Sequence, residues 1–210
     1  MEIHAPEGPI LSLKEFFVHI GIVTIGILIA LSLEGLLEWR HHRELVAEAR
    51  ANITSEIQDN RKELDYFIKN APQAQRDHEQ ALQFIGKVLA HRDLGTHASL
   101  RLVAHLSELN STSWTTAQAV GALSFMEYGE VKKYARVYQL QEEFLRLQQK
   151  DLDTVASALA MFSEGKDPTE LPEADLRTEK NRILDSLSAI RIQEQIGQGL
   201  MKRYIEVLGK

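Results

Sequence analysis

The sequence predicts an all-α protein in which one N-terminal transmembrane helix continues into an elongated antiparallel helical bundle. Residues 16–33 form an uninterrupted apolar stretch. The 210-residue chain contains only five prolines and twelve glycines, the residues least compatible with helix interiors. Through most of the remaining chain, apolar residues recur every three or four positions, as in amphipathic helices. We therefore divide the chain into an irregular tail (1–12), a transmembrane helix (13–38) and a soluble helical-bundle domain (39–210).

The apolar stretch has the length and composition of a membrane span. Twelve of its eighteen residues are Phe, Val, Ile or Leu, and none carries a full charge. At about 1.5 Å per residue it makes roughly 27 Å of helix, close to the ~30 Å hydrocarbon core of a bilayer. A cleaved signal peptide is one alternative, but the preceding segment offers only Lys14 and the helical pattern continues past the small residues near Ser32. A buried core helix is the other, but it rarely needs to be apolar on every side.

Residues in and beside this stretch predict contacts with lipid and with a second membrane helix. Gly26 and Ala30 form a small-xxx-small pair that lets two helices approach closely, in a homodimer or with another membrane protein. Trp39 suits the membrane interface, where its ring is apolar and its N–H reaches water. Arg40 and Arg43 follow it and are expected to meet lipid phosphates.

Charge gives the expected location and excludes one class of partner. The formal net charge is −6, and no basic stripe with interleaved aromatic residues is present, which argues against nucleic-acid binding. Lys14 is the only Lys or Arg before the apolar stretch, whereas three arginines follow it by residue 50. The positive-inside rule then favours a single-pass protein of the inner (cytoplasmic) membrane with a cytoplasmic body. The chain has no cysteine, so disulfides, thiolate nucleophiles and Cys-zinc sites are excluded.

The first half of the body is expected to contain four helices. The first runs from about Leu13 to Lys69 with a seam of apolar residues, and the sequence Asn70-Ala71-Pro72 is expected to end it. Helices at about 73–91 and 98–109 follow. A further helix, 114–126, contains a stripe of small residues that includes Gly121.

Two long helices complete the predicted bundle as an antiparallel hairpin. After a corner at residues 127–129, apolar and aromatic residues from Tyr134 to Phe162 alternate spacings of four and three, which predicts a coiled-coil-like seam. Gln141 and Gln148 occupy seam positions, where polar residues set register or lie at a wet edge. The loop 163–172 contains a glycine and two prolines. The last helix, about 173–208, has an apolar face wide enough for two neighbours.

No motif of a known catalytic chemistry is present, so we expect no catalysis and no cofactor or metal. There is no phosphate-binding loop, nucleophile elbow or zinc-protease signature. Glu38 and His41 match a di-metal helix spacing only once, and His78 beside Glu79 is interpreted as a surface pair. Six of the fourteen aromatic residues lie between 111 and 144. They predict either packed core or a small-molecule pocket between helices, for which the candidate residues are Trp114, Gln118, Phe125, Tyr128, Tyr134 and Tyr138.

Two segments, IGIVTIGILIALSLEGLLEW and STSWTTAQAVGALSFMEY, give the chain a resemblance to a family. It resembles uncharacterised bacterial single-pass membrane proteins with an N-terminal transmembrane helix of the "GILIAL…W" type and a helical domain. The resemblance implies a membrane-anchored helical body and carries no known activity or catalytic residue. One departure is that the tail before the span is acidic here, whereas such relatives often carry several basic residues there.

The sequence thus predicts a membrane-anchored helical scaffold, sensor or protein-interaction module. The alternative is a small-molecule-binding, four-helix-like sensory input domain that uses the aromatic stretch and signals through a partner protein.

Overall fold

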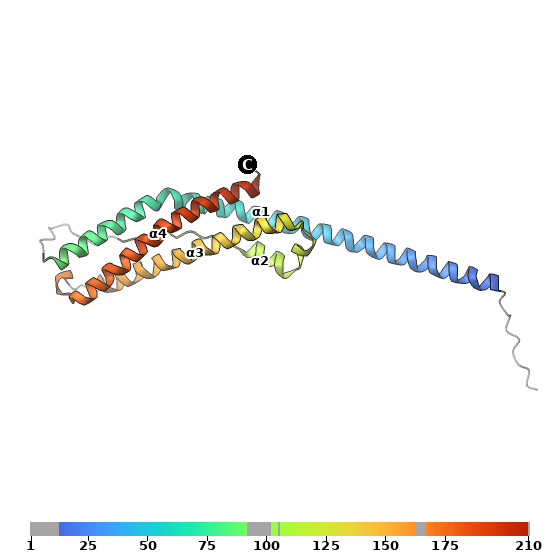
Figure 1. The fold of residues 1–210 in the computed structure, drawn as a ribbon, viewed down its shortest axis with the longest axis horizontal. Helices are drawn as coiled ribbons and strands as arrows, with labels where there is room; N and C mark the ends of the chain where they lie inside the picture. The colour runs from blue at the N-terminus through green and yellow to red at the C-terminus, as the bar shows by residue number, and fades with distance from the viewer. Residues whose placement is uncertain (1–12, 92–101, 105, 163–166, 210) are drawn as a thin grey trace, which may run out of the picture. The chain divides into compact units, whose positions relative to one another are not determined.

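A computed structural model describes residues 13–91, 102–104, 106–162 and 167–209. These residues form four α-helices and two short 3-10 helices, and no strand occurs among them. The elements are α1 (Leu13–Leu89), α2 (Thr112–Ala119), η1 (Ala122–Phe125), α3 (Tyr128–Phe162), η2 (Pro168–Glu170) and α4 (Glu173–Leu208) (Figure 1). The predicted all-α bundle is confirmed.

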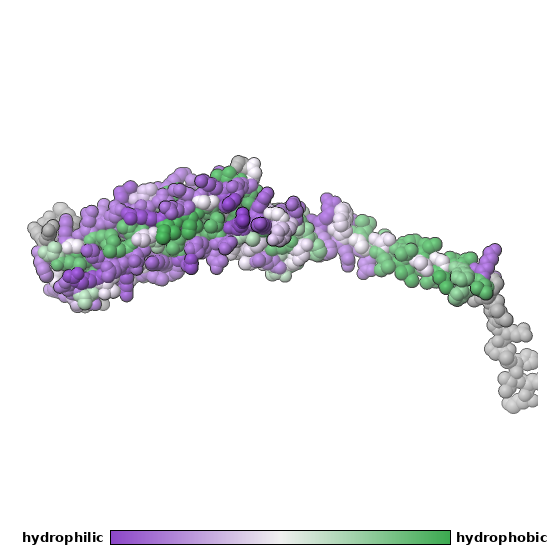
Figure 2. Space-filling model, viewed as in Figure 1, coloured by the Kyte–Doolittle hydropathy of each residue, from purple (hydrophilic) through white to green (hydrophobic). Residues whose placement is uncertain are grey.

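The chain divides into two compact units, residues 1–47 and 48–210. The described part of the first unit is the N-terminal part of α1, and none of its most apolar 18-residue window is buried. Figure 2 shows a mostly hydrophobic run along this part of α1, with hydrophilic residues at both of its ends. The Ser32 hydroxyl donates to the Leu28 carbonyl at 2.7 Å, so this polar group is satisfied within the helix. By length and composition, α1 is the one described helix that is long and apolar enough to cross a membrane.

Helix α1 continues through Pro72, so the predicted break at residues 70–72 is wrong. Proline removes one backbone hydrogen bond from a helix and costs about 3 kcal/mol in its interior. Here Pro72 itself is exposed, while Ala71 and Ala74 on either side of it are buried. The apolar face continues beyond the proline to Ile85 and Val88, both buried. Burial of this face over four further turns outweighs the cost of the proline, because each buried methylene contributes roughly 0.8 kcal/mol.

In the second unit, α1 and α3 run parallel and α4 runs antiparallel to both. Arg50 near the start of this unit pairs bidentately with Glu130, with both N···O distances 2.7 Å. Further along, the Phe67 and Phe144 rings meet edge to face at 4.8 Å. Hydrogen bonding by the Arg50 guanidinium lowers the pKa of the Glu130 carboxyl. The predicted α3–α4 hairpin is present, but the chain returns between the parallel helices α1 and α3 as a long connection.

The described part of this connection is extended, and the helix predicted over 98–109 is wrong for residues 102–104 and 106–109. Residues 98–101 and 105 lie outside the described residues. The helix predicted over 114–126 is also shorter than expected, because α2 ends at Ala119. Gly121 then adopts a left-handed conformation (φ 75°), which L side chains rarely tolerate and which commonly terminates helices.

Helix α3 buries one predicted row of residues and departs from the other beyond Tyr138. Tyr134, Gln141 and Val155 of the first row are buried as expected. The second expected row begins with Tyr138, which is buried, but Leu145 and Leu152 are half-buried and Leu159 is 57% exposed. The companion row that the structure buries lies one residue earlier in the chain, and its members are Val137, Phe144, Asp151 and Ala158.

The core contains a close helix approach at Gly197 of α4. A Cβ added at this glycine would lie 3.3 Å from Leu64 Cδ1 and 3.3 Å from Phe144 Cε2, closer than most real contacts. Glycine therefore allows α4 to approach α1 and α3 at this level. A separate apolar cluster lies where α1 and α3 end and α4 begins. Its buried members are Ala81, Phe84, Ile85, Val88, Leu102, Val155, Ala158, Leu176 and Ile183.

Candidate functional site

Three of the six predicted pocket residues form a packed aromatic cluster. The Trp114 ring stacks on Tyr138, with ring centroids 5.2 Å apart and planes 13° apart. It also lies 6.4 Å from the Tyr134 ring. All three side chains are buried, and the Tyr138 hydroxyl donates to Glu56 Oε1 at 2.7 Å. Burial, followed by the hydrogen bond to Glu56, raises the pKa of Tyr138. This cluster attaches α2 to α1 and α3.

The other three predicted pocket residues are exposed. Phe125 is 48% exposed, Tyr128 is 80% exposed, and Gln118 is also exposed. The structure thus brings Trp114, Tyr134 and Tyr138 together without the remaining three. A ligand at the aromatic stretch stays a prediction.

A ladder of carboxamide side chains holds the extended segment 106–111 on the bundle. Gln148 accepts from the Ser107 amide at 2.8 Å and donates to the Ser107 carbonyl at 3.2 Å. In the same way, Asn60 accepts from the Asn110 amide at 2.8 Å and donates to the Asn110 carbonyl at 2.7 Å. Gln141 also donates to the Asn110 carbonyl at 2.8 Å. A carboxamide has one acceptor and two donors and so matches a peptide unit. The glutamines of the α3 seam therefore bind backbone instead of only setting helix register.

Replacing Gln148 with alanine should loosen this segment at Ser107. The Ser107 amide loses its acceptor, so we expect its hydrogen exchange to speed up about tenfold, corresponding to ~1.4 kcal/mol, within the range of one hydrogen bond. Residue-resolved hydrogen exchange measures this effect. The matched control is Gln149→Ala, because the exposed Gln149 side chain donates to Asp153 of its own helix and to no other described residue. Unchanged exchange at Ser107 in Gln148→Ala would contradict the ladder.

The predicted membrane-contact residues lie on the exposed N-terminal part of α1. Gly26 and Ala30 are both exposed, and a Cβ built at Gly26 meets no described atom within 4 Å. The Arg43 guanidinium carbon lies 4.7 Å from the centroid of the Trp39 ring, in a cation–π contact. Arg40 lies 3.8 Å from Glu44 in an exposed pair. Trp39, Arg40 and Arg43 are thus all exposed just beyond the apolar stretch. We refer to these three residues as the collar.

His78 is fully buried, so its interpretation as a surface residue is wrong. Its Nε2 lies 2.9 Å from Asp151 Oδ1 of α3 and 3.0 Å from Ser186 Oγ of α4. The Ser186 hydroxyl donates to Asp151 Oδ1 at 2.6 Å. The other ring nitrogen, Nδ1, lies 2.8 Å from the Ala74 carbonyl oxygen. The three side chains join the three long helices in the middle of the bundle.

The geometry of this cluster distinguishes it from a nucleophilic triad. The Ala74 carbonyl can only accept, so Nδ1 of His78 donates to it. Nε2 lies within hydrogen-bond distance of both the Asp151 carboxyl group and the Ser186 hydroxyl. In a nucleophilic triad the carboxylate and the hydroxyl lie at opposite ring nitrogens. Here both lie at Nε2 and the hydroxyl donates to the carboxylate, which is an arrangement for joining helices.

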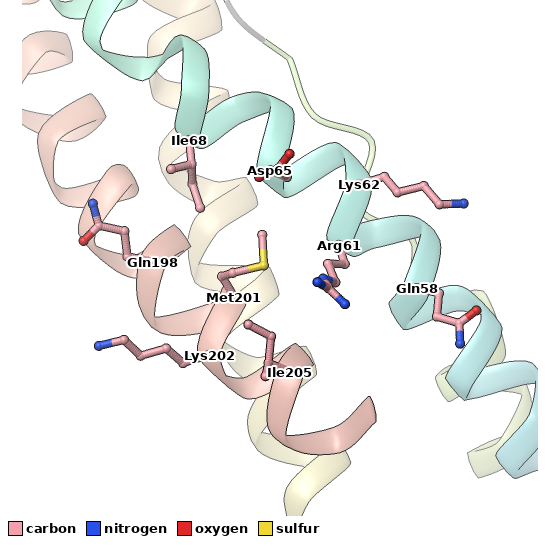
Figure 3. A pocket seen from close by; sticks show the side chains of 9 residues that line it. All are labelled: Gln58, Arg61, Lys62, Asp65, Ile68, Gln198, Met201, Lys202 and Ile205. Atoms are coloured by element: carbon pink, nitrogen blue, oxygen red, sulfur yellow. The ribbon is translucent and has the colours of Figure 1, made fainter. Parts of the chain in front are cut away.

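An open groove lies between α1 and α4, on residues for which the sequence predicted no function (Figure 3). Its volume is about 830 Å³. Ile68, Met201 and Ile205 form an apolar floor, and Figure 3 shows the Arg61 guanidinium directed from α1 toward α4. The remaining lining residues are polar: Gln58, Lys62, Asp65, Gln198 and Lys202.

One signal could have located the groove. Met201 and Ile205 lie on a predicted α4 face that is wider than one neighbour needs, and Ile68 directly follows the buried Phe67 on α1. Apolar residues at the edges of two facing stripes mark a space that no third helix fills.

For Asp151 and His78, nothing in the local pattern indicates burial. No cluster of three or more His, Cys, Asp or Glu suited to a metal ion occurs within the described residues.

Comparisons with protein-family models, with curated proteins and with solved structures found no match for this chain.

Proposed function

We propose that this chain is a single-pass membrane protein whose helical body is a binding module, a scaffold or sensor, with no catalytic step. The observation that carries the proposal is the exposed apolar stretch of α1. All of its large apolar side chains from Phe16 to Leu33 are between 47% and 63% exposed. A soluble protein rarely exposes so large a contiguous apolar surface. Twelve strongly apolar residues contribute roughly −4 to −7 kcal/mol to membrane insertion.

The collar of Trp39, Arg40 and Arg43 supports this placement. An indole with a guanidinium over its face suits the headgroup region, where the ring is half in lipid and the charge meets phosphate. The excess of arginine after the stretch favours a body in the cytoplasm. The resemblance to bacterial single-pass proteins supports the inner membrane as the location.

Membrane insertion and orientation are tested on the full chain. We expect the protein to resist extraction by alkaline carbonate and to dissolve only with detergent. A C-terminal reporter active only in the cytoplasm should work, and one active only in the periplasm should not. Extraction by carbonate would overturn the membrane anchor, while periplasmic reporter activity would overturn only the orientation.

Gly26 and Ala30 are proposed as the contact with a second membrane helix, in a homodimer or with another membrane protein. Because the chain has no cysteine, a single cysteine at position 26 or 30 gives an unambiguous cross-link. A cysteine at position 28, on the opposite face of the helix from both 26 and 30, is the matched control. Equal cross-linking at positions 26 and 28 would argue against a specific dimer.

A small-molecule-binding domain is the second candidate function. The observation that favours it is the groove between α1 and α4, whose volume lies within the 300–1,000 Å³ typical of ligand sites. A ligand there could act on a partner protein through the relative position of the two helices.

A further inference from the structure

The groove between α1 and α4 combines an apolar floor with positive charge. Ile68, Met201 and Ile205 are all partly exposed to it. Along α1 the lining runs from Gln58 to Ile68, about three turns or roughly 15 Å. A floor of this length accommodates an apolar chain lying along the helices.

The charges of the groove are not balanced. Lys62 pairs with Asp59 at 2.8 Å, and Asp65 pairs with Lys69. Arg61 and Lys202 have no carboxylate partner within the described residues of the chain. Arg61 is half-buried and directed into the groove, whereas Lys202 extends outward at the α4 rim (Figure 3). Two uncompensated cations thus lie beside an apolar floor in a protein whose formal net charge is −6.

This chemistry identifies the class of ligand. A guanidinium presents a rigid fork of donors that matches a carboxylate or phosphate bidentately. The Lys202 ammonium, on its flexible four-carbon stem, can add a second charge from the rim. Methionine is unbranched and polarizable, so it adapts to apolar chains of varied shape.

We propose that the groove binds a single-chain amphiphile with an anionic head group, such as a medium-chain carboxylate taken from solution. Its head lies at Arg61 and Lys202, and its tail lies along Ile68, Met201 and Ile205. This inference rests on the proposed role as a binding module and is independent of membrane insertion, which depends on other residues of α1.

The test is photolabelling of the full chain in nanodiscs of zwitterionic phosphatidylcholine. The probe is decanoate carrying a diazirine on its alkyl chain, and mass spectrometry maps the adducts. We expect saturable adducts on the α1 and α4 peptides that contain Ile68 and Met201, displaced by excess decanoate. The double variant Arg61→Gln/Lys202→Gln should lower this labelling at least tenfold.

Two controls separate specific binding from general charge and general apolar affinity. Lys132→Gln/Lys133→Gln removes the same charge from exposed positions of α3 outside the groove and should leave labelling unchanged. The uncharged decanol form of the probe should label the groove at least tenfold less than the carboxylate. Circular dichroism melting checks that each variant remains folded.

Three results would overturn the proposal. The first two are equal labelling of wild type and Arg61→Gln/Lys202→Gln, and equal labelling by the decanol probe. The third is that excess decanoate fails to displace the probe, whereas anionic phospholipid added to the disc displaces it. The last result would assign the groove to lipid head groups. Failure of the proposed membrane anchor is distinguishable from failure of the groove proposal. Carbonate extraction tests the apolar stretch, whereas photolabelling tests the groove residues.

Discussion

Replacing both Ile25 and Ile29 with arginine is expected to release the protein from membranes into the carbonate-soluble fraction. Both residues lie near the middle of the apolar stretch and are more than half exposed. A central arginine costs about 2.5–3.5 kcal/mol on the insertion scale, and each substitution also removes the contribution of an isoleucine. Two such changes cost roughly 6–8 kcal/mol, which is similar to or larger than the whole estimated gain of −4 to −7 kcal/mol.

The matched control for this experiment is Ala47→Arg/Ala51→Arg. It adds two arginines at the same four-residue spacing of the same helix, at exposed positions beyond the apolar stretch. We expect this variant to stay in the membrane fraction. Retention of Ile25→Arg/Ile29→Arg after carbonate treatment would show that the stretch is not what attaches the protein to the membrane.

Replacing His78 with leucine is expected to lower the free energy of unfolding by about 3–5 kcal/mol, because it leaves the Asp151 carboxyl group buried without its His78 partner. Asp151→Leu should have an effect of similar size, because it leaves the buried His78 ring without Asp151. The double variant His78→Leu/Asp151→Leu removes both buried polar partners and keeps apolar volume, so it should be more stable than either single variant. Denaturant unfolding of the full chain in detergent, followed by circular dichroism, measures all three variants.

A neighbouring surface pair provides the control for His78. Glu79 and Arg191 also join α1 to α4 at 2.9 Å, but both side chains are about half exposed. Glu79→Gln should therefore cost less than 1 kcal/mol. A loss below 1 kcal/mol in His78→Leu would mean that the buried pair contributes no more than this exposed one. A double variant as unstable as the sum of the singles would show that the two residues act independently.

The sequence alone was sufficient where the physical signal is local. Helix propensity and apolar spacing depend on residues within a few turns of one another. They correctly predicted the all-α bundle. The seam residues of α1 that recur every three or four positions are buried from Ala49 to Phe67, and Leu45 at its start is half-buried: Ala49, Ile53, Ile57, Asn60, Leu64 and Phe67. The apolar stretch was equally evident, because eighteen residues without a charge need no tertiary contact to be recognised.

Tertiary contacts decided the features that the local pattern predicted wrongly. The apolar residues of segment 98–109 favour a helix, but carboxamides up to 50 positions away in the chain bind the backbone of its described part in extended form. Pro72 favours a helix end, but burial on both sides of it keeps α1 continuous. In each case the energy of a distant contact exceeds a local preference of a few kcal/mol at most.

The candidate sites divide in the same way. Trp39, Arg40 and Arg43 are recognisable from their place after an apolar stretch, and aromatic density predicted that Trp114, Tyr134 and Tyr138 would matter for packing. Beyond Tyr138 the second buried row of α3 was predicted one residue out, because an aspartate in a row otherwise built of Val137, Phe144 and Ala158 argues against burial unless its partner is known. That partner, His78, lies 73 positions earlier in the chain, and only the packing of three helices brings the two together. The groove likewise is formed only by the packing of two distant parts of the chain, because its lining residues come from α1 and α4.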